Sequence, residues 1–589
     1  MHIMTLACDL DGTLAEHGQV APETWGLLQR LKGANWTLLL VTGRTLKTFA
    51  PHGPFAEVFD AIVAEDGAVV YFPHRDIVTL PFGRLNPVLI ERLSDAGIPL
   101  ERGLAIVATH TPHDLVVLQV LRDVAGGATV EYNRGAVMVL PPGATKGTGL
   151  RYALRELGRS PRSVIACGDA ENDRSLFECA ELAAAVSNAT EDVRALADMV
   201  LPEPDGAGVR ALGEGLLRKQ LPPYRQRPER MLPLGERPDR TPVLLDPFWL
   251  LDASLAIVGS SGGGKSWLAG LLAEELLRRG YQICLIDPEG DYRAMRAFPH
   301  TLLLGGVSAP LPPVSDIATL SEYAETSLVL DLSLETHERR MTYVAGLLHE
   351  LGCLRARYGR PHWLLIDEAQ SFCLTPDGDA ATTLCRLIHE GGVGIVSYQP
   401  SRLPRAILEQ IDHWLVTRLV ASEEQACVAD QLARCPGWAD LEPSLSTLPR
   451  GQAYLCVNTR SATPAPAQLV QFRARPRTVP HIRHLHKYLR APLPYDKRFH
   501  FHDGQGRYLG ESAANLWELR GALSALPLDS LRYHVERGDL ERWVGLVLRD
   551  PELGRQISKI TRRHLEGEAL REALAAVVSE RYDELDSLV

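Results

Sequence analysis

Cysteine is scarce in this chain, which has ten among 589 residues and neither a C-x-x-C pair nor a dense cluster of them. A disulfide-rich secreted fold or a zinc ribbon needs such clusters, so the sequence argues against both and fits a reducing cytoplasm. No run of about 18 or more apolar residues occurs, and we therefore expect no transmembrane helix. The N-terminus leads directly into an apolar strand and an acidic motif, so we expect no signal peptide.

Positive charge is also in short supply. The 62 Lys and Arg residues are outnumbered by 73 Asp and Glu residues, which gives a formal net charge of -11. The chain thus lacks an overall basic field for nucleic acid, although its 62 Lys and Arg residues allow a local basic surface. Hydrophobic residues make up 45% of the chain. At roughly 150 residues per domain, the length predicts about three or four domains.

The first 218 residues predict a doubly wound α/β domain. Apolar runs at 3–8, 38–41 and 164–167 indicate buried parallel strands, and amphipathic helical stretches separate them. Each run stops at polar residues, which therefore meet at one edge of the sheet. Residues 84–142 interrupt this rhythm and predict a smaller α+β cap.

Two stretches rich in Pro and Arg, residues 219–243 and 475–497, predict linkers. Between them, residues 244–474 repeat the alternation of strands and helices and predict a RecA-like P-loop domain. Residues 498–589 predict a small helical domain. The predicted strands of the P-loop domain are 255–258, 283–286, 328–330, 363–366 and 395–397, and helices of the last domain are predicted at 512–525 and 564–580.

Two carboxylates stand at the end of the first predicted strand. Asp9 and Asp11 are two residues apart, where the chain turns through Gly12. This spacing lets Asp9 attack a phosphorus as a nucleophile, so that hydrolysis proceeds through an acyl-phosphate. Asp11 reaches the leaving oxygen, where it can protonate the leaving group and later activate water.

Further polar residues follow the other strand ends of this domain. Asp169 and Asp173 add carboxylates, and hard oxygen ligands of this kind suit Mg²⁺. Thr42 is placed to donate a hydrogen bond to the phosphoryl oxygens. Lys146 is placed to neutralise charge on the transferring group. The sequence therefore predicts a complete phosphatase site.

With these motifs, residues 1–215 resemble the haloacid dehalogenase superfamily, in its Cof/sucrose-phosphatase branch. The resemblance implies a Rossmann-like fold, Asp9 as nucleophile, Asp11 as general acid/base and a substrate-selecting cap at 84–142. It also implies Mg²⁺ held by Asp9, by the main chain of Asp11 and by Asp169, with Asp173 in support. The family often has Asn before Gly67, where this chain has Asp66, and this departure points to altered cap or substrate contacts. The matching motifs are DLDGTL at 9–14, VTGR at 41–44, ATKG at 144–147 and GDAENDRSLF at 168–177.

A glycine-rich loop follows the predicted strand 255–258 and precedes a predicted helix at 267–279. This context makes the match to G-x-x-x-x-G-K-[ST] specific. Glycines turn backbone N–H groups toward phosphates, Lys265 reaches the β- and γ-phosphates, and Ser266 ligates Mg²⁺. The loop residues are Gly259, Ser260, Ser261, Gly262, Gly263, Gly264, Lys265 and Ser266.

The second half of the nucleotide site is predicted at the ends of two later strands. Asp367 follows an apolar run and is expected in the metal shell, while Glu368 is expected to polarise water. Gln399 is placed to sense the γ-phosphate or to orient that water. The loop and these residues together predict an ATP-hydrolysing site.

Residues 245–470 resemble the HerA/FtsK branch of P-loop ATPases. The resemblance implies a ring, taken as a hexamer, with ATP between subunits and an arginine reaching in from a neighbour, for which Arg386 and Arg418 are candidates. Two departures are the missing β-barrel before the core and the missing basic pair at 389–394, which puts the usual contacts between subunits and DNA translocation in doubt. The matching motifs are DPEGDY at 287–292, LLIDEAQ at 364–370, SYQPS at 397–401 and LPRG at 448–451.

The last domain carries clustered histidines. His500 and His502 alternate on one predicted strand, so we assign them to the face of that strand rather than to a metal site, and Trp543 is expected in the core.

The leading functional hypothesis is a bifunctional hydrolase. A Mg²⁺-dependent phosphomonoesterase is fused to a ring-forming ATPase, with DNA or RNA as a candidate partner. One alternative is a polynucleotide end-processing enzyme in which a phosphatase and a P-loop kinase share a chain. Another is a DNA translocase or defence motor with the phosphatase fold as accessory. Asp367-Glu368 and Gln399 favour ATP hydrolysis by water over transfer to a hydroxyl.

Overall fold

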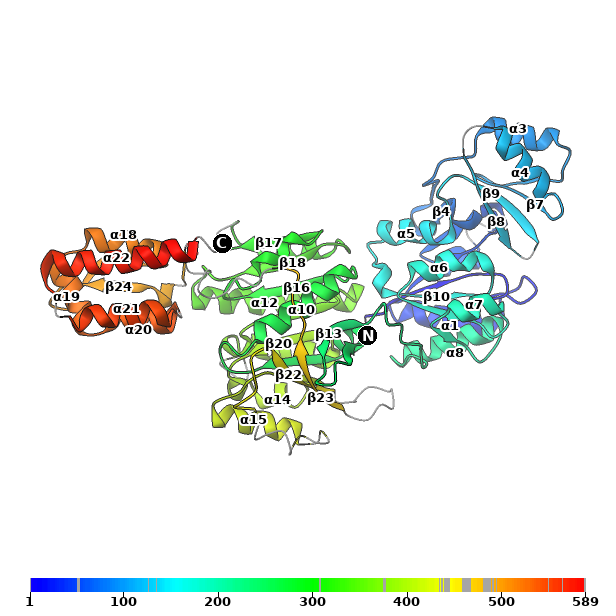
Figure 1. Ribbon diagram of the computed structural model, residues 1–589. Helices are drawn as coiled ribbons and strands as arrows, with labels where there is room; N and C mark the ends of the chain where they lie inside the picture. The colour runs from blue at the N-terminus through cyan, green and yellow to red at the C-terminus, as the bar shows by residue number, and fades with distance from the viewer. Residues whose placement is uncertain are drawn as a thin grey trace.

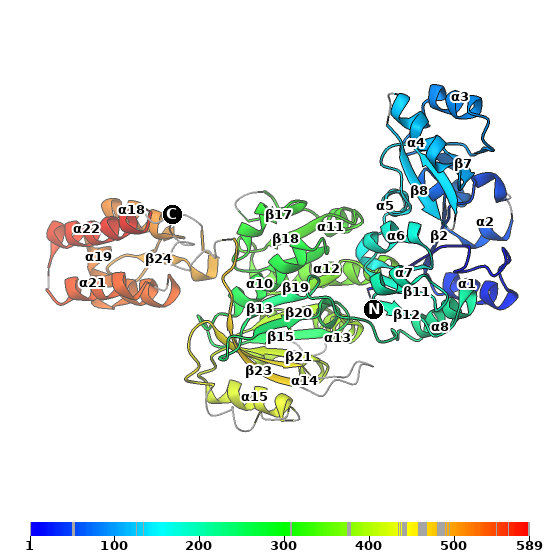
Figure 2. The same cartoon turned by 45° about the vertical axis from the view of Figure 1, so that its right-hand side comes forward.

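The computed structural model shows an elongated molecule with its domains in a row (Figure 1). The N-terminal α/β domain and its cap stand on one side of a central α/β domain, and the C-terminal domain stands on the other (Figures 1 and 2). The N-terminus lies where the first two domains meet. The structure describes residues 2–49, 53–124, 127–133, 135–306, 309–373, 378–433, 435, 438, 445–457, 468–479, 489, 492–493, 495–548, 550–563 and 565–586.

The N-terminal domain is built on an eight-stranded sheet, and the predicted Rossmann-like fold is confirmed. Its order is β12 (Met199–Val200), β11 (Leu182–Ala185), β10 (Val164–Gly168), β1 (Thr5–Cys8), β2 (Thr37–Val41), β3 (Ala61–Ala64), β4 (Val69–Phe72) and β5 (Ile77–Thr79). The strands β12 to β3 are parallel, and β4 and β5 join antiparallel at the edge. The three predicted strands are neighbours at the centre, so the polar residues after them meet. The helices are α1 (Pro22–Gly33), α2 (Pro54–Val58), α5 (Lys146–Glu156), α6 (Arg174–Cys179), α7 (Glu191–Leu196) and α8 (Asp205–Leu217).

The predicted cap is present as a separate small α+β unit above this sheet (Figure 1). Its four-stranded antiparallel sheet runs β6 (Glu101–Arg102), β7 (Val107–His110), β9 (Ala136–Leu140) and β8 (Thr129–Asn133). The helices α3 (Pro87–Asp95) and α4 (Asp114–Asp123) accompany it. The cap has its own hydrophobic cluster, which includes Leu89, Leu93, Val117 and Val139. The cap thus has a hydrophobic core of its own.

The central domain is built on an eleven-stranded sheet. Its order is β14 (Pro242–Leu245), β13 (Leu232–Glu236), β23 (Gln468–Ala474), β22 (Gln452–Val457), β21 (His413–Val416), β15 (Ser254–Val258), β20 (Val393–Ser397), β19 (Trp363–Ile366), β16 (Ile283–Asp287), β18 (Ser327–Asp331) and β17 (Thr301–Gly305). Every strand predicted for this domain is present, in the parallel part from β21 to β17.

Helices cover both faces of the central sheet. On β15, Ala256 and Val258 belong to one buried cluster, and Leu255 and Ile257 to another. Because neighbouring residues of a strand point to opposite faces, both faces are buried, as the apolar runs predict. The helices are α9 (Pro247–Leu251), α10 (Lys265–Arg278), α11 (Val314–Ser321), α12 (His337–Tyr358), α13 (Asp379–Glu390), α14 (Arg405–Leu408) and α15 (Ser422–Leu432).

The expected linker 219–243 is more ordered than its composition indicates. The strands β13 and β14 form a hairpin within and just after it, and β13 pairs antiparallel with β23. The segment also contacts the N-terminal domain, because Arg227 and Arg230 form ion pairs with the buried Asp198. The composition did not indicate the strand β13 because its pairing partner, β23, comes from the far end of the central domain.

The C-terminal domain is mainly helical, as predicted, but begins with a hairpin of β24 (Phe499–His502) and β25 (Tyr508–Ala513). His500 and His502 lie on β24, and Trp543 is 7% exposed in the domain core, which agrees with the sequence. The helices are α18 (Leu516–Ala525), α19 (Leu528–Glu536), α20 (Asp539–Arg542), α21 (Pro551–Thr561) and α22 (Gly567–Asp586).

One feature departs from the expected chemistry of cysteine. A disulfide joins Cys435 to Cys456, although the sparse cysteines predict no disulfide framework. Cys456 lies on β22 and Cys435 follows α15, 21 residues earlier in the sequence. Within the described ranges, no helix is both long and apolar enough to cross a membrane.

The N-terminal and central domains meet through buried polar contacts. The backbone N–H of His2 donates to the Asp252 carboxylate at 2.6 Å, and the hydroxyl of Tyr281 donates to Glu181 at 2.6 Å. The Ser163 hydroxyl lies 3.2 Å from Nε2 of His362. Buried hydrogen bonds of this kind fix relative orientation, because a shifted arrangement would leave buried donors and acceptors unpaired. The two domains therefore form a specific junction.

We expect acid to weaken this junction through His362. Its Nδ1 accepts a hydrogen bond from the backbone N–H of Gln282 at 2.9 Å, which requires neutral imidazole. Burial lowers the pKa of His362 well below 6.5, and His2, Arg360 and Arg162 add to this. Below about pH 6.5, His362 is protonated in the unfolded chain and stays neutral in the folded chain. The free energy of unfolding therefore falls as the pH drops below about 6.5.

The measurement is the melting temperature between pH 7.5 and pH 5. A H362Q variant should lose less stability across this range than the unaltered chain, whereas the exposed-site control H337Q should behave like the unaltered chain. An equal acid-dependent loss in H362Q would show that His362 does not carry the effect.

Candidate functional site

The first candidate site is a buried cluster of charges at the carboxyl edge of the N-terminal sheet. Asp9, Asp169 and Asp173 offer carboxylate oxygens within 4.8 Å of one another. The Nζ of Lys146 lies 2.7 Å from Asp9 and 2.7 Å from Asp173. The Thr13 hydroxyl donates to Asp169 at 3.0 Å, and the carboxylate of Asp173 accepts the backbone N–H of Asp169 at 2.8 Å. The structure thus brings together the residues that the motifs predict.

Burial and mutual repulsion perturb the charges of this cluster. Burial raises the pKa of the Asp9 carboxyl well above its ordinary value, Lys146 opposes this, and Asp173 and Asp169 add to it. Burial disfavours the charge of Lys146, but Asp173, Asp9 and Asp66 outweigh it and raise the pKa of the ammonium group. Three carboxylates and one lysine leave an excess of negative charge, which a divalent cation would balance.

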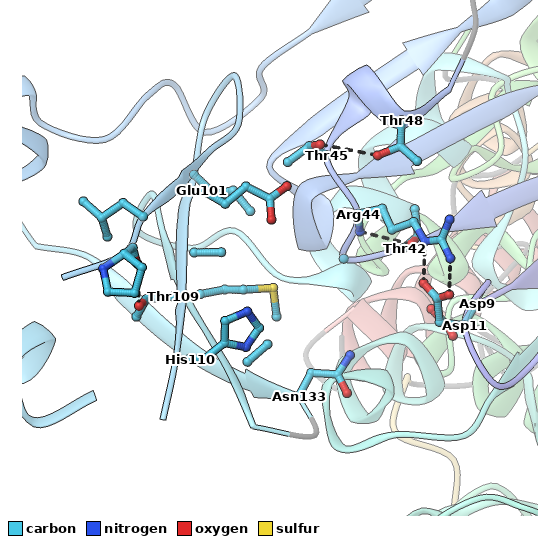
Figure 3. A pocket seen from close by; sticks show the side chains of 17 residues that line it. Asp9, Asp11, Thr42, Arg44, Thr45, Thr48, Glu101, Thr109, His110 and Asn133 are labelled. Atoms are coloured by element: carbon cyan, nitrogen blue, oxygen red, sulfur yellow. Dashed lines mark hydrogen bonds and ion pairs between the residues drawn. The ribbon is translucent and has the colours of Figure 1, made fainter. Parts of the chain in front are cut away.

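Asp11 and Thr42 lie beside this cluster. The guanidinium of Arg44 donates through Nε to Asp11 at 2.7 Å and forms a second bond through Nη2 (Figure 3). Asp11 is therefore at the surface of the pocket and held by Arg44. Thr42 is 1% exposed, and its hydroxyl accepts the backbone N–H of Arg44 at 3.2 Å. The VTGR motif therefore places a cation next to the predicted acid/base.

The pocket above Asp9 is shared between the N-terminal domain and its cap (Figure 3). Its volume is about 420 Å³. Polar side chains from both units line the pocket, together with apolar residues such as Leu100, Ile106 and Met138. The polar groups from the cap are Glu101, Thr109, His110 and Asn133, and those from the domain are Asp9, Asp11, Thr42, Arg44, Thr45 and Thr48.

Glu65 fastens the cap to the domain. Its buried carboxylate accepts backbone N–H groups of Leu104 at 2.8 Å and of Ala105 at 2.8 Å. The same turn has left-handed backbone at Glu65 and at Gly67, where a Cβ would lie 1.9 Å from the carbonyl oxygen of Thr145. Asp66 between them accepts from Nδ2 of Asn172 at 2.9 Å. The departure noted in the sequence, Asp66, thus contacts Asn172 of the N-terminal domain, while its neighbour Glu65 holds the cap.

We expect E65Q to loosen the cap without touching the reacting groups. The amide would present N–H groups to backbone donors, which leaves buried donors unpaired at a cost of about 1–3 kcal/mol. Amide hydrogen exchange at 104–106 should speed up, and KM for a phosphomonoester should rise by roughly tenfold. The exposed control E91Q should change neither. Unaltered exchange in E65Q would contradict this role of Glu65.

The second candidate site lies at the carboxyl edge of the central sheet. The glycine loop joins β15 to α10, and Gly262 and Gly264 have left-handed φ angles of 73° and 106°. The backbone N–H of Ser260 donates to the carbonyl of Arg418 at 2.7 Å. Lys265 is 6% exposed, and its Nζ donates to the carbonyl of Ser260 at 3.3 Å. Ser261, Gly263 and Ser266 complete the loop as predicted from the motif.

A hydrogen-bonded relay follows Asp367 and Glu368. Gln370 donates through Nε2 to Glu368, and its Oε1 accepts the hydroxyl of Ser397 at 2.7 Å. The same hydroxyl accepts the backbone N–H of Gln399 at 3.1 Å. Burial raises the pKa of Asp367 well above its ordinary value, with Glu368 adding to it, and burial also raises the pKa of Glu368. These hydrogen bonds join Glu368 to the backbone of Gln399 through two residues, Gln370 and Ser397, that have no predicted role.

The matches to known proteins follow these two sites. The family of haloacid dehalogenase-like hydrolases matches residues 6–83 and 110–211. Phosphoglycolate phosphatase 2 of Saccharolobus solfataricus is 30% identical over 177 residues, which are 30% of this chain and 74% of that protein. Phosphoglycolate phosphatase of Halobacterium salinarum is 30% identical over 216 residues, 35% of this chain and 94% of that protein.

The chain belongs to the haloacid dehalogenase-like hydrolases. A crystal structure of a haloacid dehalogenase-like hydrolase from Bacteroides thetaiotaomicron has 19% identity and a TM-score of 0.32, and the match covers 36% of this chain and 99% of that one. This hydrolase also carries a second unit, since the central domain of the helicase HerA matches residues 232–336. It is therefore a phosphatase-type hydrolase fused to a HerA-type P-loop domain.

The two arginines predicted to act on a neighbour's nucleotide are both exposed in this hydrolase. Arg386 lies on α13 and lines an open cavity of about 380 Å³ with Cys385, His389 and Gln410. Arg418 contacts the glycine loop through its backbone, and its Nε donates to the carbonyl of Ser446 at 2.9 Å. Their proposed role depends on a second subunit.

Proposed function

We propose that this hydrolase is a Mg²⁺-dependent phosphomonoesterase joined to a ring-forming ATPase. The observation that carries the phosphatase is the buried arrangement of Asp9, Asp169 and Asp173 around Lys146. In this proposal Asp9 is the nucleophile, Asp11 the general acid/base, and Thr42 and Lys146 hold the phosphoryl group. Arg44 orients Asp11, because its fork of donors restricts the carboxylate.

The donor set fits a magnesium ion. Hard carboxylate oxygens are what Mg²⁺ takes from proteins, and their excess negative charge calls for a cation. Asp9 and Asp169 would hold it, with the main chain of Asp11 beside them and Asp173 in support. When bound, Mg²⁺ would neutralise charge on the phosphoester. Lys146 would bridge Asp9 and Asp173 and keep the nucleophile oriented.

The central domain is proposed to hydrolyse ATP. Gly259, Gly262, Gly263 and Gly264 shape the phosphate cradle, and Ser260, Ser261 and Lys265 contact the phosphates. Ser266 and Asp367 would hold Mg²⁺ with the nucleotide, while Glu368 polarises the attacking water. Hydrogen bonds from Glu368 through Gln370 and Ser397 hold the backbone of Gln399 near Glu368, and in this proposal the side chain of Gln399 senses the γ-phosphate.

A ring of subunits and a nucleic-acid partner belong to the same proposal. The HerA match supports assembly into a hexamer, in which Arg386 or Arg418 would complete a neighbour's nucleotide site. DNA or RNA would act as an effector of the ring, and the protein would work in the cytoplasm. For the phosphatase, the relatives suggest small phosphorylated acids such as phosphoglycolate, and the pocket has room for a larger polar phosphomonoester.

The test is phosphate release from a panel of phosphomonoesters with and without Mg²⁺, together with ATP hydrolysis with and without DNA or RNA. Electron micrographs recorded with and without ATP test whether the subunits assemble into a ring. Activity toward at least one ester and toward ATP supports the proposal. Label from γ-phosphate appearing on a 5′ end of DNA or RNA would favour an end-processing kinase instead.

A further inference from the structure

The loop after β16 borders the ATP site and is held rigidly. The carboxylate of Asp287 accepts the backbone N–H groups of Gly290 at 2.6 Å, Asp291 at 3.0 Å and Tyr292 at 2.9 Å. Several hydrogen bonds to one buried carboxylate leave the loop little freedom. The backbone position from which the Glu289 side chain extends is therefore fixed.

A lysine from outside the central domain reaches that loop. The Nζ of Lys497 lies 2.8 Å from Oε1 of Glu289, and the two side chains are 43% and 22% exposed. Lys497 ends a turn of 3-10 helix, Tyr495–Lys497, just before β24. Its carbonyl accepts the indole N–H of Trp543 at 2.8 Å, and Trp543 is buried in the C-terminal domain. Lys497 is thus fixed in the C-terminal domain while its charge lies at the central one.

The surroundings of Glu289 are strongly negative. Glu289 acts on both Asp367 and Glu368, raising the pKa of each, whereas Lys265 and Lys497 lower that of Glu368. Asp496, the neighbour of Lys497, interacts electrostatically with Arg340 of α12, which belongs to the central domain. A polyphosphate is itself negative and is repelled by these carboxylates, so a positive charge that neutralises one of them favours its binding.

We propose that Lys497 is a positioning residue of the ATPase site, supplied by the C-terminal domain to neutralise Glu289 and so to favour binding of ATP. The inference rests on the proposed ATP hydrolysis. Lys497 touches Glu289, and its effect on the nucleotide passes through that carboxylate. The domain with no predicted chemistry thereby acquires a role in the ATPase.

The test compares KM and kcat for ATP in the full-length chain. K497A should raise KM by about fivefold, the upper end for a partly exposed pair, with little change in kcat. K497R should restore KM because it keeps the charge. The effect should shrink at 0.5 M salt, since exposed charges are screened. K559A, an exposed lysine of the same domain, is the matched control.

A double-variant cycle assigns the effect to Glu289. In the E289Q background, K497A should no longer raise KM, because the carboxylate that needs a partner is gone. A K497A effect of equal size in both backgrounds, or none in either, would overturn the inference. Absence of ATP hydrolysis in the unaltered chain would instead refute the proposed ATPase, so the two failures are distinct. Melting curves establish that each variant is folded.

Discussion

D9N is expected to lower phosphate release from a phosphomonoester by at least about 1,000-fold while ATP hydrolysis continues. An amide of the same shape cannot form the acyl-phosphate, and no other carboxylate of the cluster takes its place. Lys146 keeps its contact with Asp173, so the buried lysine retains a counter-charge and the domain remains folded. The measurements are kcat/KM for the best ester of the panel and the ATPase rate.

The matched control for D9N is D95N, an exposed aspartate on the cap helix α3. It should keep both activities. Phosphatase activity that survives in D9N would reject Asp9 as the nucleophile. Loss of ATP hydrolysis in D9N, on a protein that melts normally, would show that the two sites are not separable.

K265A should produce the opposite pattern. ATP hydrolysis should fall by about 1,000-fold, because the lysine is the positive group of the glycine loop that reaches the β- and γ-phosphates. Phosphatase activity should stay at least partly intact, since Lys265 contacts the loop carbonyl of Ser260 and lies near the ring of Tyr398, within the central domain. K559A again serves as the control.

The two activities are read from the same preparations of K265A. A mutant that hydrolyses ATP normally would remove the glycine loop from the mechanism. If K265A is folded but loses both activities, phosphatase activity depends on the nucleotide site. The expected result, one activity lost and the other retained, would establish two independent centres in one chain.

Much of this architecture could be predicted because buried parallel strands are short apolar runs. The runs ending at Asp9, Asp169 and Asp367 are continuous and stop at polar residues, so both the strand and the position of the site follow from the sequence. The motifs then assign roles to residues that the sheet brings together. The cap could also be predicted, because residues 84–142 interrupt the regular alternation of strands and helices in the N-terminal domain.

What the sequence could not predict depends on distant partners. The strand β13 lies in a Pro- and Arg-rich stretch and pairs with β23, which comes from the end of the domain. Arg44 is part of a motif, but its pairing with Asp11 depends on two loops meeting. Lys497 lies at the end of an expected linker, and its contact with Glu289 depends on how the C-terminal domain docks. Local pattern carries no signal for such contacts.

The junction between the first two domains has a directional consequence. His2 and Ser163 precede β1 and β10, while Asp252 and His362 precede β15 and β19. The two sheets therefore meet back to back, at the ends where their strands begin, and the chemistry lies where those strands finish. Phosphate released at one centre has no short path to the other. Any coupling between the two centres would therefore have to pass through the strands and the domain junction rather than through a shared cavity.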